Sequence, residues 1–132
     1  MFGSKKKKAL KSSEITTTLL SPIFHIVKLQ NGGQIPPEAK NDDFVLGYMS
    51  GAFFKVWGGS GISDSSLFNL ALEKYFSNFF PSEGVELADL CNTKVNDNSF
   101  KEFVSIGAGD IERILGGDVE NNSLADHFLS NY

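Results

Sequence analysis

The sequence predicts an all-α fold, an irregular bundle of five or six helices. Apolar residues recur three and four positions apart in several segments, which is the spacing of one face of a helix. Clusters of glycine and proline separate those segments. No segment shows the sustained alternation of apolar and polar residues that indicates a half-buried strand. Because the segments differ in length and in the width of their apolar faces, an irregular arrangement is favoured over a simple four-helix bundle.

Length and composition indicate one folded domain behind a short tail. The chain has 132 residues, of which 41% are hydrophobic and 12 are phenylalanine, enough for one well-filled core. We expect residues 1–12 to form a disordered basic tail and residues 13–132 to form a single helical domain. Five lysines precede Ser12, so the remaining chain carries seven basic and 16 acidic residues, a balance of −9.

This separation of charge bears on the partners that the chain can bind. An acidic body repels phosphate backbones, so we expect no nucleic acid to bind through the folded part. The lysine run Lys5–Lys8 could make a weak contact with an anionic membrane or nucleic acid. A tail that only increases hydration is the simpler interpretation.

The first helix is expected over residues 13–31. Its apolar stripe consists of Ile15, Leu19, Ile23, Ile26 and Val27, with Leu20 and Phe24 beside it. Pro22 either kinks this helix or marks its true start. The helix should end at Asn31, because two glycines follow.

The second helix, over residues 42–57, is expected to be the most buried, because apolar residues cover more than half of its circumference. Gly47 and Gly51 share the remaining narrow face. Glycine within a helix costs up to about 1 kcal/mol relative to alanine, so two on one face indicate that another backbone packs there. We expect a neighbouring helix of the same chain to fill this groove, in preference to a partner subunit.

Four further helices complete the prediction. Ser63 is the expected N-cap of the third helix, which Pro81 ends. A weaker fourth helix is expected over residues 82–95. The fifth opens with a Ser-x-x-Glu capping box at Ser99, and a short sixth helix begins at Ser123.

The sequence contains no motif that assigns a catalytic site. His25 and His127 are the only histidines and Cys91 is the only cysteine, so no zinc-ligand spacing exists and we expect no metal and no cofactor. Cys91 lies on the apolar face of its helix, where a buried, unreactive thiol is expected. The glycine-rich segment at residues 58–61 lacks the Lys-Ser/Thr pair of a phosphate-binding loop. Catalytic residues are therefore unknown, and enzymatic activity is disfavoured.

A cytoplasmic location is the default expectation. A single cysteine gives no intramolecular disulfide, and the N-terminal lysine run is not followed by the apolar region of a secretory signal. The strongest apolar run, Phe44–Trp57, has 14 residues and includes Lys55. A membrane-spanning helix needs about 20 apolar residues, so we expect no transmembrane segment.

These observations favour a non-enzymatic protein-interaction or regulatory module, most simply a homodimer. The second and third helices carry ten aromatic residues, and any that the domain does not bury would form an interface. One alternative is a small-ligand-binding helical domain with an aromatic pocket. Another is an acidic decoy of a nucleic-acid-binding protein. The candidate interface or pocket residues are Gly47, Gly51, Tyr48, Trp57 and His25.

Overall fold

The computed structural model describes residues 2–118 and 122–132, and in these ranges it confirms the all-α prediction. Six α-helices and one 3-10 helix are present, and the described ranges contain no strand. In chain order they are α1 (Phe2–Gln30), η1 (Pro37–Asn41), α2 (Asp43–Gly58), α3 (Ser65–Phe79), α4 (Gly84–Lys94), α5 (Asn98–Leu115) and α6 (Ser123–Asn131). No helix in the described part of the chain combines the length and the apolar character needed to cross a bilayer.

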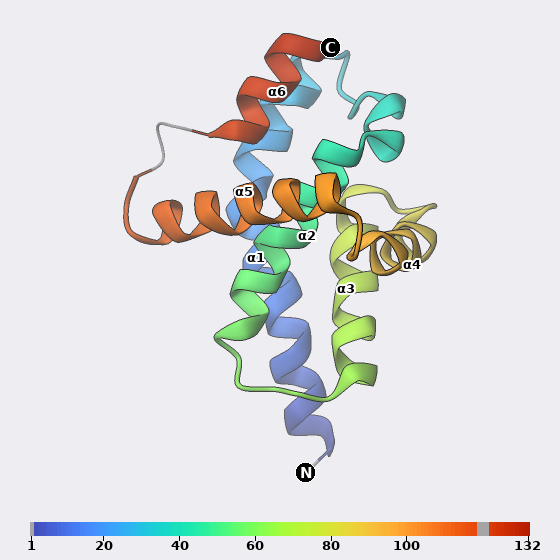
Figure 1. The fold of residues 1–132 in the computed structure, drawn as a ribbon, viewed down its shortest axis with the longest axis vertical. Coiled ribbons are helices and arrows are strands. Elements are labelled where there is room, and N and C mark those ends of the chain that lie inside the picture. Colours follow the sequence, from blue (N-terminus) through green and yellow to red (C-terminus); the bar gives the residue numbers. More distant parts are fainter. Residues whose placement is uncertain (1, 119–121) are drawn as a thin grey trace.

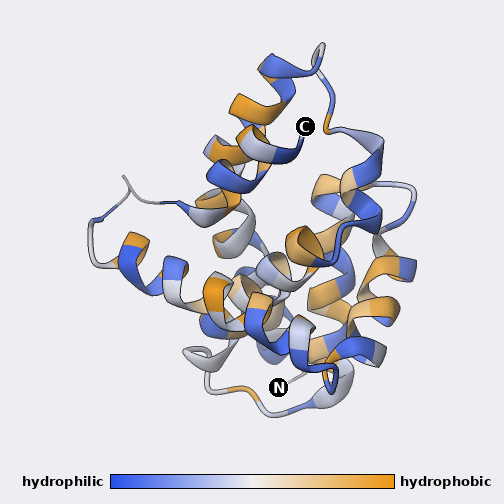
Figure 2. Ribbon diagram, turned by 45° about the horizontal axis from the view of Figure 1, so that its top comes forward, coloured by the Kyte–Doolittle hydropathy of each residue, from blue (hydrophilic) through white to orange (hydrophobic). Residues whose placement is uncertain are grey.

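The helices pack around α2. Helix α5 crosses α2, α1 lies along α3, and α4 packs on α3 (Figure 1). Helix α6 contacts both α1 and α5, and the two chain ends lie at opposite ends of the molecule. Hydrophobic and hydrophilic residues alternate along the helices (Figure 2), as expected for helices that each bury one face.

Helix α1 begins earlier than predicted. It starts at Phe2, so residues 2–12 are helical and the expected disordered tail is not present. Ala9 and Ser12 are buried, which fixes this segment to the body. The prediction relied on the charge of the lysine run, whereas lysine is itself a good helix former. Pro22 lies inside α1 and does not mark its start.

The buried face of α1 also differs from the predicted apolar stripe. Its N-terminal half buries small or hydroxyl-bearing residues, namely Ala9, Ser12, Ser13 and Thr16. Ser13 Oγ donates to the carbonyl oxygen of Ala71 on α3 at 2.5 Å, and Thr16 Oγ1 donates to the carbonyl oxygen of Ser12 at 2.7 Å. Because these hydroxyls are satisfied, they can be buried. Ile15 and Ile26 are exposed instead.

The N-caps of α3, α5 and α6 are acidic or amide residues in place of the predicted serines. Asp64, rather than Ser63, caps α3, and Asp97 caps α5. Asn122, rather than Ser123, caps α6. Each side-chain oxygen accepts hydrogen bonds from backbone N–H groups two or three residues ahead, and a carboxylate also interacts favourably with the positive end of the helix dipole.

Candidate functional site

The glycine groove of α2 is filled by α5 of the same chain, as predicted. A Cβ atom at Gly47 would lie 2.6 Å from Phe103 Cβ, and one at Gly51 would overlap the carbonyl group of Val104. The contact is reciprocal, because a Cβ atom at Gly107 of α5 would overlap the backbone of Tyr48. Gly47 and Gly51 therefore allow two helix backbones to approach closely inside the molecule.

Tyr48 lies in a buried polar network that joins three helices. Its hydroxyl donates to Asp110 Oδ2 at 2.8 Å and accepts from Asn122 Nδ2 at 3.2 Å. Asp110 is 2% exposed, and it also accepts from the backbone N–H of Ser123 at 2.8 Å and from Arg113. Burial, together with the Asp110 carboxylate, raises the pKa of Tyr48 far above its usual value. These contacts hold α6 against the crossing of α2 and α5. No linear motif marks Asp110, so its role could not be predicted from the sequence.

Asp42 is a second polar junction, and it connects the start of α2 with α6. Besides capping α2, its Oδ2 atom lies 2.7 Å from His127 Nε2 and accepts from the Tyr132 hydroxyl at 2.7 Å. Burial alone would raise the pKa of Asp42, but the hydrogen bonds from His127 and Tyr132 outweigh it and hold the pKa below its ordinary value. The His127 ring also stacks on Phe44, with centroids 4.3 Å apart.

The aromatic residues of α2 and α3 do not form an exposed surface. Of the ten counted in the sequence, six are buried and four are half-buried. Trp57, one of the half-buried residues, packs against Phe53 and Phe68 with ring centroids 5.9 and 5.4 Å away. Contacts between rings therefore account for much of the aromatic excess, and none of these ten side chains is among the exposed large apolar residues of the described chain.

His25 lies in different surroundings from the other candidate residues. It is exposed on α1 and lines a hollow of about 580 Å³ between α1 and α3, together with Thr17, Ser21 and Asn78. Tyr48 is fully buried in the polar network and Trp57 belongs to the aromatic cluster. The structure therefore does not bring His25, Tyr48 and Trp57 together around one pocket.

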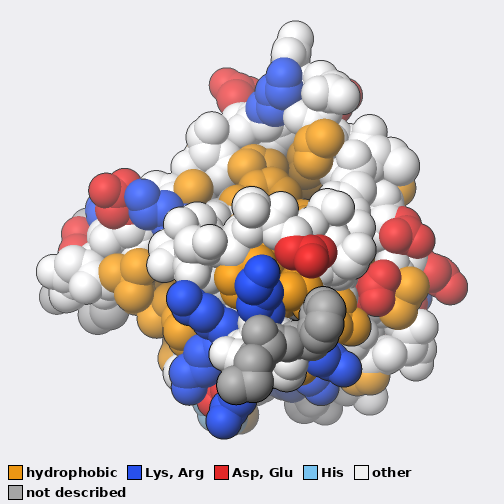
Figure 3. All heavy atoms as spheres, turned by 90° about the horizontal axis from the view of Figure 1, so that it is seen from below, with side chains coloured by type: hydrophobic (Ala, Val, Ile, Leu, Met, Phe, Trp, Pro, Cys, Tyr) orange, Lys and Arg blue, Asp and Glu red, His pale blue; other side chains and the backbone are white. Residues whose placement is uncertain are grey.

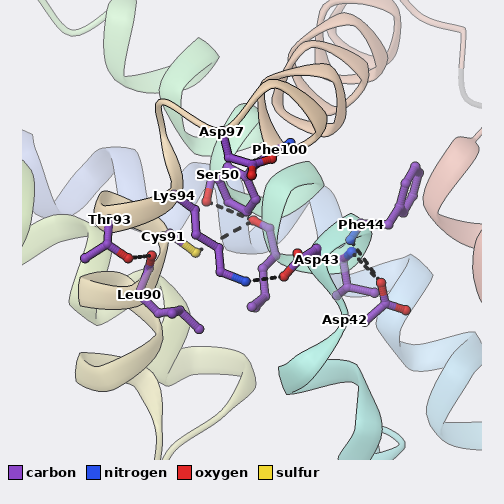
Figure 4. Close-up of polar contacts among 12 residues, drawn as sticks. Asp42, Asp43, Phe44, Ser50, Leu90, Cys91, Thr93, Lys94, Asp97 and Phe100 are labelled. Carbon is purple, nitrogen blue, oxygen red and sulfur yellow. Dashed lines mark hydrogen bonds and ion pairs between the residues drawn. The ribbon is translucent and has the colours of Figure 1, made fainter.

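Cys91 is buried between α4 and α2 (Figure 4). Its Sγ atom lies 4.0 Å from the carbonyl oxygen of Leu46, and burial raises the pKa of the thiol to about 11. Lys94, one turn further along α4, forms an ion pair with Asp43 of α2. A thiol that stays protonated at neutral pH is a poor nucleophile, so this region is structural. Within the described ranges, no three His, Cys, Asp or Glu residues are grouped to hold a metal ion.

The exposed apolar side chains of α1 lie on two surfaces. The first, which we call the basic-end groove, has a volume of about 340 Å³. Lys8, Lys11 and Lys55 line it together with the apolar residues Ile15, Val56 and Leu115. Viewed from the end where the chain starts, lysine side chains gather around hydrophobic ones (Figure 3). The N-terminal lysines were evident in the sequence, but nothing there linked them to residues of α2 and α5.

The second surface lies further along the outer side of α1. We call it the α1 stripe, and it consists of Leu19, Pro22, Ile26 and Leu29. The spacings of three and four place these residues on one face of the helix, and Ile26 and Leu29 are 53% and 70% exposed. Leu19 and Ile26 belong to the apolar stripe that the sequence predicted as a buried face, whereas Pro22 and Leu29 were not part of that prediction.

No family model, no curated protein and no solved structure matches the chain. Function is therefore inferred from the two exposed surfaces and from the engagement of the polar groups inside the molecule.

Proposed function

We propose that the protein is a non-enzymatic interaction module that forms a homodimer through the α1 stripe. The observation that carries the proposal is the exposure of large aliphatic side chains in a row on a helix that is otherwise packed against the body. Leu29 and Ile26 are among the most exposed large apolar residues of the described chain. A two-fold contact between identical stripes would bury these side chains in both copies at once.

The energetics of this contact favour a weak dimer. Complete burial of a leucine or isoleucine side chain contributes about 1.5–3 kcal/mol, and the side chains of the α1 stripe are already partly covered in the monomer. Association costs at least about 4 kcal/mol in lost translational and rotational freedom. We therefore propose a dimer that dissociates on dilution.

The non-enzymatic part of the proposal is supported by the engagement of the groups that could perform chemistry. The Tyr48 hydroxyl and the Asp110 carboxylate bond to each other inside the molecule. Asp42 and His127 hold α6 in place, and the Cys91 thiol is buried and protonated. We include a cytoplasmic location in the proposal, because a single free thiol suits a reducing compartment.

The alternatives receive less support. A ligand pocket would have to use the hollow beside His25, where hydroxyl, amide and amine groups lie among Pro22, Phe24 and Phe79, whereas a ligand pocket combines a mostly apolar lining with only a few polar groups. An acidic decoy needs carboxylates gathered on one surface. The described carboxylates include helix caps and partners of Lys11, Lys40, Lys55 and Lys94, distributed over several helices.

Dimer formation can be tested with a matched pair of variants. Ile26 in the α1 stripe and Val85 on α4 are both 53% exposed. Because a charge within an apolar contact must be desolvated, I26E should remain a monomer at concentrations where the wild-type mass approaches twice the monomer value of 14.4 kDa. V85E should behave as wild type. Light scattering and sedimentation equilibrium across a concentration series measure the mass; a wild-type protein that stays monomeric throughout would refute the proposal.

A further inference from the structure

The geometry points to a second surface with a different partner: we infer that the basic end of the molecule docks on an anionic lipid membrane. This inference goes beyond the proposed homodimer and does not depend on it, because it uses the N-terminal turns of α1 and the basic-end groove. The α1 stripe begins at Leu19, beyond Ile15, the last α1 residue that lines the groove.

The basic end concentrates positive charge on the surface. Lys5–Lys8 are all exposed on the first turns of α1, and Lys11 continues the series one turn later. Lys55 belongs to α2 and lines the same groove as Lys8 and Lys11. The rest of the chain is acidic, with a balance of −9 from Ser12 onward, so the molecule would be oriented with this end toward an anionic surface.

The molecule itself compensates this charge poorly. The lysines occupy the positive end of the α1 dipole, and the first turn of α1 contains no acidic residue. Lys5 and Lys8, and likewise Lys7 and Lys11, have the spacing at which like charges repel on a helix. Lys11 and Lys55 pair with Glu14 and Glu112 at 3.6 and 3.7 Å, but both carboxylates are about 70% exposed, and such surface pairs are weak. An anionic partner would relieve the repulsion.

The apolar residues among the lysines favour a membrane over other anions. Ile15 and Leu115 are 38% and 59% exposed, and with Val56 they form the apolar part of the groove. A bilayer interface accepts apolar side chains below the headgroups while lysine amines remain among the phosphates. A nucleic-acid backbone offers charge without an apolar layer. The five basic residues of α1 at this end are all lysines, which suit attraction to a diffuse surface charge better than recognition of one phosphate.

The test measures binding of the full chain to lipid vesicles by co-sedimentation at low salt. Vesicles containing phosphatidylglycerol should bind the protein, and vesicles of phosphatidylcholine alone should not. Each lysine near such a surface strengthens binding by about fivefold. The variant K5Q/K6Q/K7Q/K8Q should therefore lose at least about a hundredfold in affinity. L115S should bind more weakly than wild type, because it removes an inserted side chain.

The control has the same net charge. K28Q/K40Q/K74Q/K101Q removes four lysines from elsewhere on the surface and should retain most of the binding. Circular dichroism verifies that both quadruple variants fold. If both quadruple variants lost the same affinity, binding would depend on net charge alone and the inference would be overturned. It would also be overturned if the wild type did not bind anionic vesicles. Tighter binding to a polyglutamate peptide than to the vesicles would assign the basic end to an acidic protein instead.

Discussion

Asp110 shows how a single buried charge can determine the position of a helix. Its carboxylate accepts from Tyr48 of α2, from the first backbone N–H of α6 at Ser123 and from Arg113. Removal of the carboxylate would leave the buried Tyr48 hydroxyl and the half-buried Ser123 N–H without their acceptor, which is more costly than the loss of an exposed hydrogen bond.

We therefore predict that D110A lowers the free energy of unfolding by about 3 kcal/mol. The measurement is urea denaturation followed by circular dichroism. D89A, which removes an exposed carboxylate from α4, should change the unfolding free energy by less than about 0.5 kcal/mol. Equal unfolding midpoints for D110A and the wild type would show that the network does not hold α6.

Asp42 makes the stability of the protein depend on pH in the acidic range. Its pKa in the folded protein lies below the ordinary value of 3.8, so its contribution is fully present above that value and is lost as the pH falls through the folded pKa. Asparagine is also a good N-cap, so D42N should lose mainly the negative charge of the carboxylate that bonds His127 and Tyr132.

The wild type should accordingly be more stable than D42N at neutral pH, and the difference should shrink below about pH 4. Urea denaturation at a series of pH values measures it. Y132F removes one of the hydrogen bonds to Asp42. Its loss of stability relative to wild type should be smaller than that of D42N and should also shrink at acidic pH. A stability difference between wild type and D42N that is the same at pH 3 and pH 7 would contradict the assignment.

At the scale of helices, the crossing of α2 and α5 depends on glycines. A side chain at Gly51 would meet backbone atoms of Val104, which cannot move aside as a flexible side chain could, whereas a Cβ atom at Gly109 of α5 meets nothing within 4 Å. G51A should therefore be destabilised by about 2 kcal/mol or more through overpacking. G109A should be stabilised by about 0.5–1 kcal/mol, because alanine is the better helix former. Thermal unfolding compares the two variants, and similar shifts in the same direction would refute the close crossing.

Periodicity predicted the elements well and their orientations less well. The predicted bounds of α2, α3 and α4 lie close to the observed ones, because glycine follows α2 and Pro81 separates α3 from α4. The prediction of the buried face of α1 was wrong because Ser12, Ser13 and Thr16 form part of that face. A hydroxyl can be buried when a carbonyl accepts its hydrogen bond, and for Ser13 that carbonyl belongs to Ala71 of α3. Apolar periodicity along one segment contains no information about such a partner.

At the scale of the whole molecule, features that arise within one helix were predictable from the sequence, and features that several helices form together were not. The glycine groove was predictable, because its cause lies within one helix. The Asp110 and Asp42 junctions, the basic-end groove and the exposure of the α1 stripe each depend on residues far apart in the chain. They emerge only when the helices are assembled. In this account α1 has two exposed parts, with a charged part for a membrane and an apolar part for a second copy.

Methyl NMR of the unmodified sequence can show whether the α1 stripe forms the contact between two copies of the chain. Ile26 lies in the α1 stripe, whereas Ile106 is a partly exposed isoleucine of α5. As the concentration rises from micromolar to millimolar, we predict that the methyl signals of Ile26 and Leu29 shift while that of Ile106 stays constant. Constant signals for Ile26 and Leu29 over the whole range, or a shift confined to Ile106, would show that the α1 stripe is not the contact between two copies.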